Sequence, residues 1–290
     1  ELGLIDGLVT SAEWRSEMQA ISGGSGDTYG QVVYRSYLQS MRPPVPEQNP
    51  AADTIAVITA KGTILDGEQP SGEVGGDTIT KLIRKAKNSK NVKAIVLRVD
   101  SPGGSATASE MIRSELLAAQ ESGKPVVASM GGYAASGGYW ISSTANKIFA
   151  SETTITGSIG VFTVFPTFER SLDYLGVHSD GIGTTSLSGA MNSFEEINPV
   201  FKRVLQNSVN QTYNKFLALV SEGRGLSIEE ADSVAQGRVW SGSRALEHGL
   251  IDGIGDINVA IESAAVLAGL TDYEVVYIEK DLSPKELFLR

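Results

Sequence analysis

The chain has 290 residues, of which 41% are hydrophobic and 20% charged, a composition that fits an ordinary globular protein and excludes a disordered or fibrous one. Lys and Arg (24) are outnumbered by Asp and Glu (34), and a net charge of −10 would repel a phosphate backbone, so we expect no nucleic-acid partner. Without Cys, and with two distant histidines at 178 and 248 that show no metal-ligand spacing, the chain is expected to hold neither a metal nor another cofactor.

The first seven residues repeat a segment from near the other end of the chain. Glu1–Gly7 matches Glu247–Gly253 at every position but the second. Coincidence is the alternative, because glycine is common where helices end. We interpret residues 1–20 as the tail of an upstream copy of the same domain. Residues 21–52, loose in composition and rich in Gly, Ser and Pro, are predicted to be a linker with one helix, followed by a domain over 53–290.

From residue 54 onward, short apolar segments alternate with helical ones. Segments rich in Val and Ile predict buried strands at Thr54–Ala60, Ala94–Val99, Pro125–Met130 and Lys147–Ala150. Between them, residues 77–86 and 105–119 carry apolar side chains at helical spacing. This order of strand, helix and strand predicts parallel β-α-β units and therefore an α/β fold.

The last third of the sequence is more helical. Apolar residues between Phe201 and Val220 predict a long amphipathic helix, and Ser227 with Glu230 forms a capping box for the next one. Residues 273–279 alternate in polarity and predict a peripheral strand. No apolar segment reaches the roughly 18 to 20 residues that a membrane helix needs, and the N-terminus shows no export signal.

A glycine turn follows the second predicted strand, in Asp100-Ser-Pro-Gly-Gly104. Two glycines allow a sharp turn whose N–H groups point outward and can hold an oxyanion. The alternative is a strand-to-helix turn that only needs positive φ angles.

Ser136 lies in a second cluster of small residues, Met130-Gly-Gly-Tyr-Ala-Ala-Ser-Gly-Gly-Tyr-Trp140. Only small side chains flank its hydroxyl, as a nucleophile at a tight strand-to-helix turn requires, although the pattern is not G-x-S-x-G. The alternative is a small-residue helix packed close to a neighbour. For Met130, Tyr133, Tyr139 and Trp140 we expect places in the core rather than in a groove.

A serine nucleophile needs a base, which is either a histidine or a lysine with a lowered pKa. His178 with Asp173 or Asp180 is one arrangement, whereas surface positions are expected for His178 and His248. Lys147 is the only lysine between Ser136 and Lys202, and we expect it to be solvated. A hydroxyl in Thr153–Gly160 could orient a lysine amine, or the segment could be a plain turn.

Together, D-S-P-G-G, G-G-Y-A-A-S-G-G-Y-W-I-S and T-G-S-I-G, in this order, resemble the signal peptide peptidase A (protease IV) family. The resemblance implies a Clp/crotonase-like fold of repeated β-β-α units with a C-terminal helical appendage, and serine–lysine peptidase activity. It implies that Ser136 is the nucleophile, that Ser158 orients the lysine, and that N–H groups at Gly103, Gly104 and Gly137 form the oxyanion hole.

The sequence departs from the family at the lysine. In single-copy members the lysine follows a Ser-Gly pair before the long helix, but the corresponding stretch here, Thr185–Phe194, contains none. Long members are duplicated, with the lysine in the N-terminal half. The missing lysine and the Glu1–Gly7 repeat therefore both indicate a serine-bearing half whose base lies upstream.

The resemblance also implies a substrate class, an oligomeric state and a cellular location. Substrates would be cleaved signal peptides, and the full-length chain would form a homo-oligomer, expected to be a tetramer. An anchor upstream of this sequence would hold it on the extracytoplasmic (periplasmic) side of a bacterial inner membrane, with the present chain soluble. Two alternatives stay open: a half that only assembles without catalysis, and a crotonase-type acyl-CoA enzyme, which shares the fold but needs no serine nucleophile.

Overall fold

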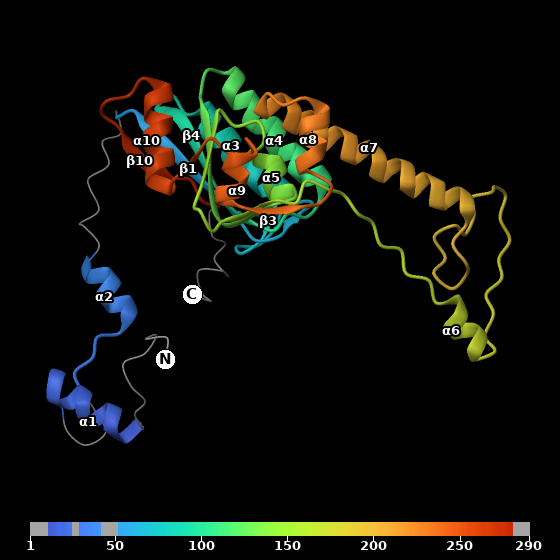
Figure 1. Ribbon diagram of the computed structural model, residues 1–290, viewed down its shortest axis with the longest axis horizontal. Helices are drawn as coiled ribbons and strands as arrows, with labels where there is room; N and C mark the ends of the chain where they lie inside the picture. The colour runs from blue at the N-terminus through green and yellow to red at the C-terminus, as the bar shows by residue number, and fades with distance from the viewer. Residues whose placement is uncertain (1–10, 25–28, 42–51, 281–290) are drawn as a thin grey trace. The chain divides into compact units, whose positions relative to one another are not determined.

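The structure is a computed structural model that describes residues 11–24, 29–41 and 52–280 (Figure 1). The chain divides into two compact units, residues 1–50 and 51–290. The first unit contains helices α1 (Ser11–Ser22) and α2 (Tyr34–Met41). The repeated segment at residues 1–7 lies outside the described residues, so the upstream-copy interpretation stays a prediction.

The second unit is built on a sheet of eight strands whose main path runs β10-β1-β4-β5-β6-β9, with every neighbouring pair on that path parallel. The strands of this path are β1 (Thr54–Lys61), β4 (Val92–Ser101), β5 (Val126–Ala135), β6 (Lys147–Ala150), β9 (Gly253–Ile254) and β10 (Glu274–Tyr277). Strand β7 (Ile155–Gly157) pairs with the end of β5 and, in antiparallel fashion, with β8 (Val239–Ser241). A separate pair joins β2 (Ile64–Leu65) and β3 (Val74–Gly75).

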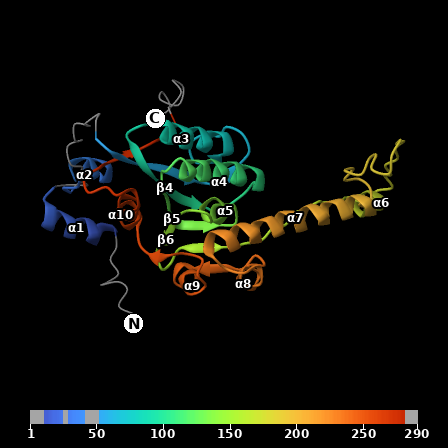
Figure 2. The same cartoon turned by 90° about the horizontal axis from the view of Figure 1, so that it is seen from above.

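Both faces of this sheet are covered by helices (Figure 2). On one face, α3 (Gly76–Asn88), α4 (Ala106–Glu121) and α5 (Gly137–Ser142) cover a large core, and on the other α10 (Ile257–Ala268) covers a smaller one. Strand β1 shows why there is a core on each face of the sheet. Ile58 contributes to the first core and Val57 to the second, because successive side chains of a strand point to opposite faces. Strands buried on both faces have continuous rather than alternating hydrophobicity, as predicted.

Three further helices lie between β7 and β9 along the chain, after the short helix α6 (Glu169–Tyr174): α7 (Pro199–Arg224), α8 (Ile228–Val234) and α9 (Gly242–Glu247). The C-terminal part of α7 packs on the core through buried side chains such as Phe216 and Val220, whereas its N-terminal part extends away from the sheet toward α6 (Figure 1). The predicted capping box of α8 is present, with Ser227 Oγ accepting the Glu230 N–H. Among the described residues, none of the helices is both long and apolar enough to span a membrane.

The predicted strands and helices of residues 54–150 are confirmed, with one informative difference. Strand β5 continues past Met130 to Ala135, because its last three residues pair with β7. Ser136 is therefore the first residue after the strand. Of the four large side chains expected in the core, Met130, Tyr139 and Trp140 are buried, but the prediction for Tyr133 is wrong: its side chain is 52% exposed.

Candidate active site

Ser136 occupies a sharp strand-to-helix turn between β5 and α5. Its φ of 52° and ψ of −118° lie in a region of backbone conformation that residues other than glycine rarely adopt. The Ser136 N–H donates to the Gly157 carbonyl at 2.9 Å, which ties the turn to the neighbouring strand β7. Strain of this kind persists only where the surrounding structure fixes it, and it is concentrated at functional sites.

The glycines around Ser136 are required by close packing. A Cβ on Gly137 would lie 2.6 Å from Ser109 Oγ, and one on Gly138 would lie 2.7 Å from the Ser101 carbonyl oxygen. A Cβ on Gly103 would come within 2.8 Å of Ser136 Cβ. The small residues thus permit the close-packed turn expected of a nucleophile, and the turn brings the Gly103 backbone against Ser136.

The glycine turn between β4 and α4 lies beside Ser136, with φ angles of 103° at Gly103 and 147° at Gly104. The Gly103 N–H donates to Ser101 Oγ at 3.1 Å, so Gly103 differs from the sequence expectation: its donor is already engaged within the turn. Gly104 N lies 3.2 Å from the position of a Cβ on Gly137, so these two backbone segments meet at the site.

Ser158 lies next to Ser136 because of strand register. Ala135 of β5 pairs with Gly157 of β7, and each strand ends there, so that the following residue in both cases is a serine. Like Ser136, Ser158 has a positive φ, of 48°. The parallel pair therefore places two strained serines at the carboxyl ends of neighbouring strands, and both line the same cavity.

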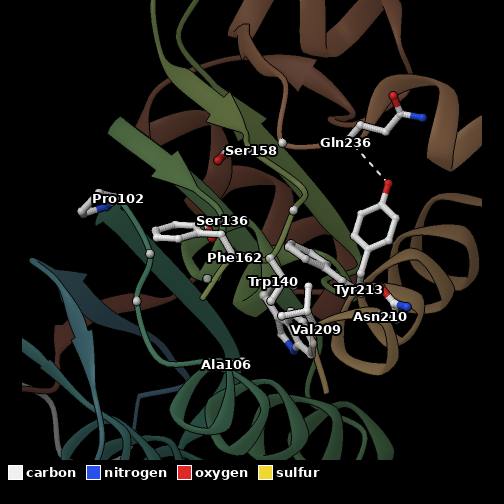
Figure 3. Close-up of a pocket in the computed structure, with 17 residues that line it drawn as sticks. Pro102, Ala106, Ser136, Trp140, Ser158, Phe162, Val209, Asn210, Tyr213 and Gln236 are labelled. Carbon is white, nitrogen blue, oxygen red and sulfur yellow. Dashed lines mark hydrogen bonds between the residues drawn. The ribbon is translucent and has the colours of Figure 1, made fainter. Parts of the chain in front are cut away.

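Both serines face one cavity of about 870 Å³ (Figure 3). Its lining is largely apolar beyond the serines and the glycine turn. The lining residues are Pro102, Gly103, Gly104, Ala106, Ser136, Gly137, Trp140, Ser158, Gly160, Val161, Phe162, Val209, Asn210, Tyr213, Phe216, Gln236 and Gly237. The cavity can hold a side chain of several carbon atoms beside a hydroxyl nucleophile.

Trp140 forms part of the cavity wall, and a carboxylate outside the cavity holds it. Its Nε1–H donates to Glu110 Oε2 at 2.9 Å, and its ring packs against Phe216 with centroids 4.6 Å apart. Glu110 also accepts hydrogen bonds from Arg113 and forms an ion pair with Lys215 at 3.1 Å. The polar atom of the indole is therefore satisfied on the outside of the cavity.

Ionisation of Glu110 should make the free energy of unfolding depend on pH. Burial opposes its ionisation, but hydrogen bonds from Arg113, Trp140 and Lys215 outweigh burial and lower the pKa of Glu110 from 4.5 to about 2. A lowered folded-state pKa contributes stability that is fully present above the unfolded pKa and is lost as the pH falls from about 4.5 toward 2. The free energy of unfolding should therefore fall less over this window in Glu110→Gln than in the unmodified chain, as measured by denaturant titration.

The matched control for this experiment is Glu262→Gln, at an exposed position of α10. This variant should follow the unmodified chain across the window. Parallel curves for Glu110→Gln and the unmodified chain would contradict the assignment of acid sensitivity to Glu110.

Tyr213 and Gln236 form another part of the cavity wall. The Tyr213 hydroxyl accepts the Gln236 backbone N–H at 3.1 Å, as Figure 3 shows, and donates to Asp232 Oδ1 at 2.5 Å. Burial, followed by the adjacent Asp232 carboxylate, raises the pKa of Tyr213. Like the Trp140 indole, the phenol is satisfied away from the cavity and presents its ring to it.

No lysine or histidine is among the residues that line this cavity in the described part of the chain. His178 is 76% exposed, lies 3.3 Å from Asp173 and is not among the lining residues. Lys147 is half-exposed, as expected, and pairs with Asp252 at 3.1 Å. His248 packs edge-on against Trp240. The described residues thus bring Ser136, Ser158 and the glycine turn together, and none of those that line the cavity is a lysine or a histidine.

Sequence reasoning missed Tyr213, Asp232 and Gln236. Tyr213 lies on the apolar face of the predicted long helix, where an aromatic residue is indistinguishable from an ordinary core residue. Gln236 carries no local signal, because its positive φ is imposed by contacts from other elements. A cavity wall built by three separate segments was not detectable from their spacing.

The chain matches known proteins along most of its length. The family model "Peptidase family S49" matches residues 118–271, which include both serines. Protease 4 of Salmonella typhi is 45% identical over 280 residues, covering 96% of this chain and 44% of that protein. The chloroplastic serine protease SPPA of Arabidopsis thaliana is 34% identical over 223 residues, covering 75% of this chain and 33% of that protein. The chain spans less than half the length of either relative.

A solved structure is similar in fold. A mutant of the 1510-N membrane-bound stomatin-specific protease covers 80% of this chain and 100% of its own, with a TM-score of 0.51 and 18% sequence identity. At this identity the likeness concerns the fold, and it confirms the predicted Clp/crotonase-like α/β architecture. With the family model and the relatives in agreement, the chain belongs to peptidase family S49, the signal peptide peptidase A (protease IV) family.

Proposed function

We propose that this chain supplies the nucleophile and the oxyanion hole of a serine–lysine peptidase whose general base comes from an N-terminal half outside this sequence. The observation that carries the proposal is the juxtaposition of Ser136 and Ser158. They follow register-paired residues, share strained backbone angles and face one cavity. A structural serine at a strand end needs none of these properties.

The chemistry is acyl transfer in two steps. A neutral lysine amine takes the Ser136 proton as Oγ attacks the peptide carbonyl, and the resulting oxyanion is held by the N–H groups of Gly104 and Gly137. Collapse of this intermediate breaks the C–N bond, and the leaving amine takes the proton from the lysine. Water then attacks the acyl-enzyme, with the same lysine as base, and releases Ser136. Gly103 contributes through the absence of a side chain against Ser136.

Ser158 serves as the group that orients the lysine amine. Its position beside Ser136, across the β5 and β7 pair, puts a hydroxyl within the same cavity as the nucleophile. A base that is oriented by a third group is the general requirement of such dyads and triads.

The substrates we propose are signal peptides left after cleavage, whose apolar side chains suit the ring faces of Trp140, Phe162 and Tyr213. For the full-length protein we propose a homo-oligomer, a tetramer, anchored by an upstream segment on the periplasmic side of a bacterial inner membrane. Family membership supports this setting, and the apolar cavity supports the proposed substrate class.

The chain by itself should fold but hydrolyse peptides poorly. We expect hydrolysis of an apolar chromogenic peptide, and labelling of Ser136 by a serine-directed acylating probe, to increase strongly when the natural N-terminal half is added. Lys147→Ala should leave both unchanged, because Lys147 pairs with Asp252 outside the cavity. Full activity of the isolated chain that is lost in Lys147→Ala would overturn the missing-base proposal.

The same experiment separates the two alternatives. A half that only assembles predicts no labelling of Ser136 even with both halves present. A crotonase-type enzyme predicts binding of an acyl-CoA thioester and no peptide hydrolysis.

A further inference from the structure

Three non-glycine residues with positive φ occur in the described part of the chain, and all three line the cavity: Ser136, Ser158 and Gln236. A positive φ at a residue with a side chain costs roughly 1 to 2 kcal/mol, so this conformation persists only where neighbouring contacts determine the backbone. The proposed chemistry accounts for the two serines. Gln236, with a φ of 58°, has no part in that chemistry, and its conformation requires a separate explanation.

The turn at Gln236 and Gly237 supports Ser158 from the side opposite β5. Ser158 N–H donates to the Arg238 carbonyl at 2.7 Å, and Gly237 N–H donates to the Ile159 carbonyl at 2.9 Å. These bonds continue the antiparallel pairing of β7 with β8. A Cβ on Gly160 would lie only 2.8 Å from Gly237 Cα, so the two backbones are in direct contact. Any shift of the turn must therefore move the backbone of Ser158.

Two side chains from other elements fix this turn. Tyr213, on α7, accepts the Gln236 backbone N–H at 3.1 Å (Figure 3), and Asp232, on α8, accepts the Tyr213 hydroxyl at 2.5 Å. Asp232 Oδ2 also accepts from Gln236 Nε2 at 3.0 Å. The Tyr213 and Gln236 bonds lower the pKa of Asp232, which keeps it a charged acceptor. Asp232 thus holds both the backbone and the side chain of the strained residue.

We propose that Asp232 is a positioning residue for Ser158, acting through the Tyr213 hydroxyl and the Gln236–Gly237 turn. Asp232 is not among the residues that line the cavity, so it touches neither substrate nor reacting atoms. Its effect is to fix the backbone that aims the Ser158 hydroxyl at the base. This inference rests on the proposed function, in which Ser158 orients the lysine amine.

The consequence is a loss of rate rather than of binding. A small misplacement of a group that orients the base can cost about 100-fold in rate. An amine released from Ser158 is also better solvated, and solvation favours its charged form, so the acid limb of the pH–rate profile should move to higher pH.

The test uses the natural full-length protein and an apolar chromogenic peptide. Asp232→Ala and Tyr213→Phe should each lower kcat by about 10- to 100-fold, with KM changed by less than about threefold, and should move the acid limb upward. Asp232→Asn keeps an oxygen that accepts the Tyr213 hydroxyl and should restore most of the rate. Tyr277→Phe, which removes a hydroxyl from the exposed edge strand β10, is the control and should leave kcat unchanged.

Unchanged kcat and pH profile in both Asp232→Ala and Tyr213→Phe would overturn the inference. A second pattern would also overturn it: an equal fall of kcat in Asp232→Ala and Asp232→Asn that matches the fall in the folded fraction at the assay temperature. Such a fall would show that the substitutions act through stability alone. If the unmodified protein neither hydrolyses the peptide nor reacts with the acylating probe at Ser136, the proposed function fails instead, and the two failures are distinguishable.

Discussion

Replacement of Ser136 with alanine should abolish peptide hydrolysis by the natural full-length protein. We expect a decrease in kcat of at least about 1,000-fold, because the variant can form no acyl-enzyme and keeps only oxyanion stabilisation and substrate binding. The fold should persist, since alanine retains the Cβ of serine and removes only an atom that faces the cavity. We therefore expect the free energy of unfolding to change by less than about 1 kcal/mol. Steady-state kinetics and denaturant titration measure the two quantities.

Two further variants serve as a control and as a test of Ser158. Ser71→Ala, in the exposed turn between β2 and β3, should change neither quantity. Ser158→Ala should lower kcat by about 10- to 1,000-fold while labelling of Ser136 by the acylating probe slows rather than disappears, because an orienting group assists the base without being attacked. Substantial turnover in Ser136→Ala would show that another group is the nucleophile.

Gly104→Ala should destabilise the protein and inactivate it together. The new Cβ would lie 2.0 Å from the Ile64 carbonyl oxygen, a backbone atom that cannot move without distorting strand β2. The φ of 147° at Gly104 adds strain. We expect a loss of about 2 to 5 kcal/mol in the free energy of unfolding. The displaced turn would also move the Gly104 N–H away from the Gly137 N–H, with which we propose it holds the oxyanion, so the rate of probe labelling at Ser136 should fall even where the protein is folded.

Gly123→Ala is a matched control, because it measures the cost of a positive φ without a steric clash. Gly123 also has a positive φ, of 87°, but a Cβ there would meet no atom within 4 Å. This variant should lose only about 1 to 2 kcal/mol and keep the unmodified labelling rate. Equal losses in Gly104→Ala and Gly123→Ala would contradict the role of the close approach to Ile64.

The strands of four or more residues in the second unit were predictable because strands buried on both faces are rich in apolar residues, whereas the short strands β2, β3, β7, β8 and β9 were not predicted. Segments such as Thr54–Ala60 and Lys147–Ala150 consist mainly of apolar residues, and the structure places strands there. The end of β5 was not predictable. Apart from Tyr133, residues 131–135 are glycine or alanine, which have weak strand preference, and the last three of them are extended because β7 pairs with them.

The candidate residues of the site could be identified from the sequence alone. Ser136 among small residues, the paired glycines at 103 and 104, and Ser158 are local patterns, and the absence of a lysine from Thr185–Phe194 is visible in the sequence directly. These features indicated a serine-bearing half of a family S49 peptidase, and family membership is confirmed.

How these groups come together depends on contacts between segments that are distant in the sequence. The register of β5 against β7 sets the two serines side by side, and Gly103 uses its N–H within the turn rather than toward the cavity. The wall formed by Tyr213 and Gln236, with Asp232 behind it, joins α7, α8 and the strand β7. Positive φ angles at non-glycine residues, such as the three in this cavity, are imposed by contacts between distant segments. Such contacts cannot be recognised from hydrophobic periodicity or composition, because neither depends on them.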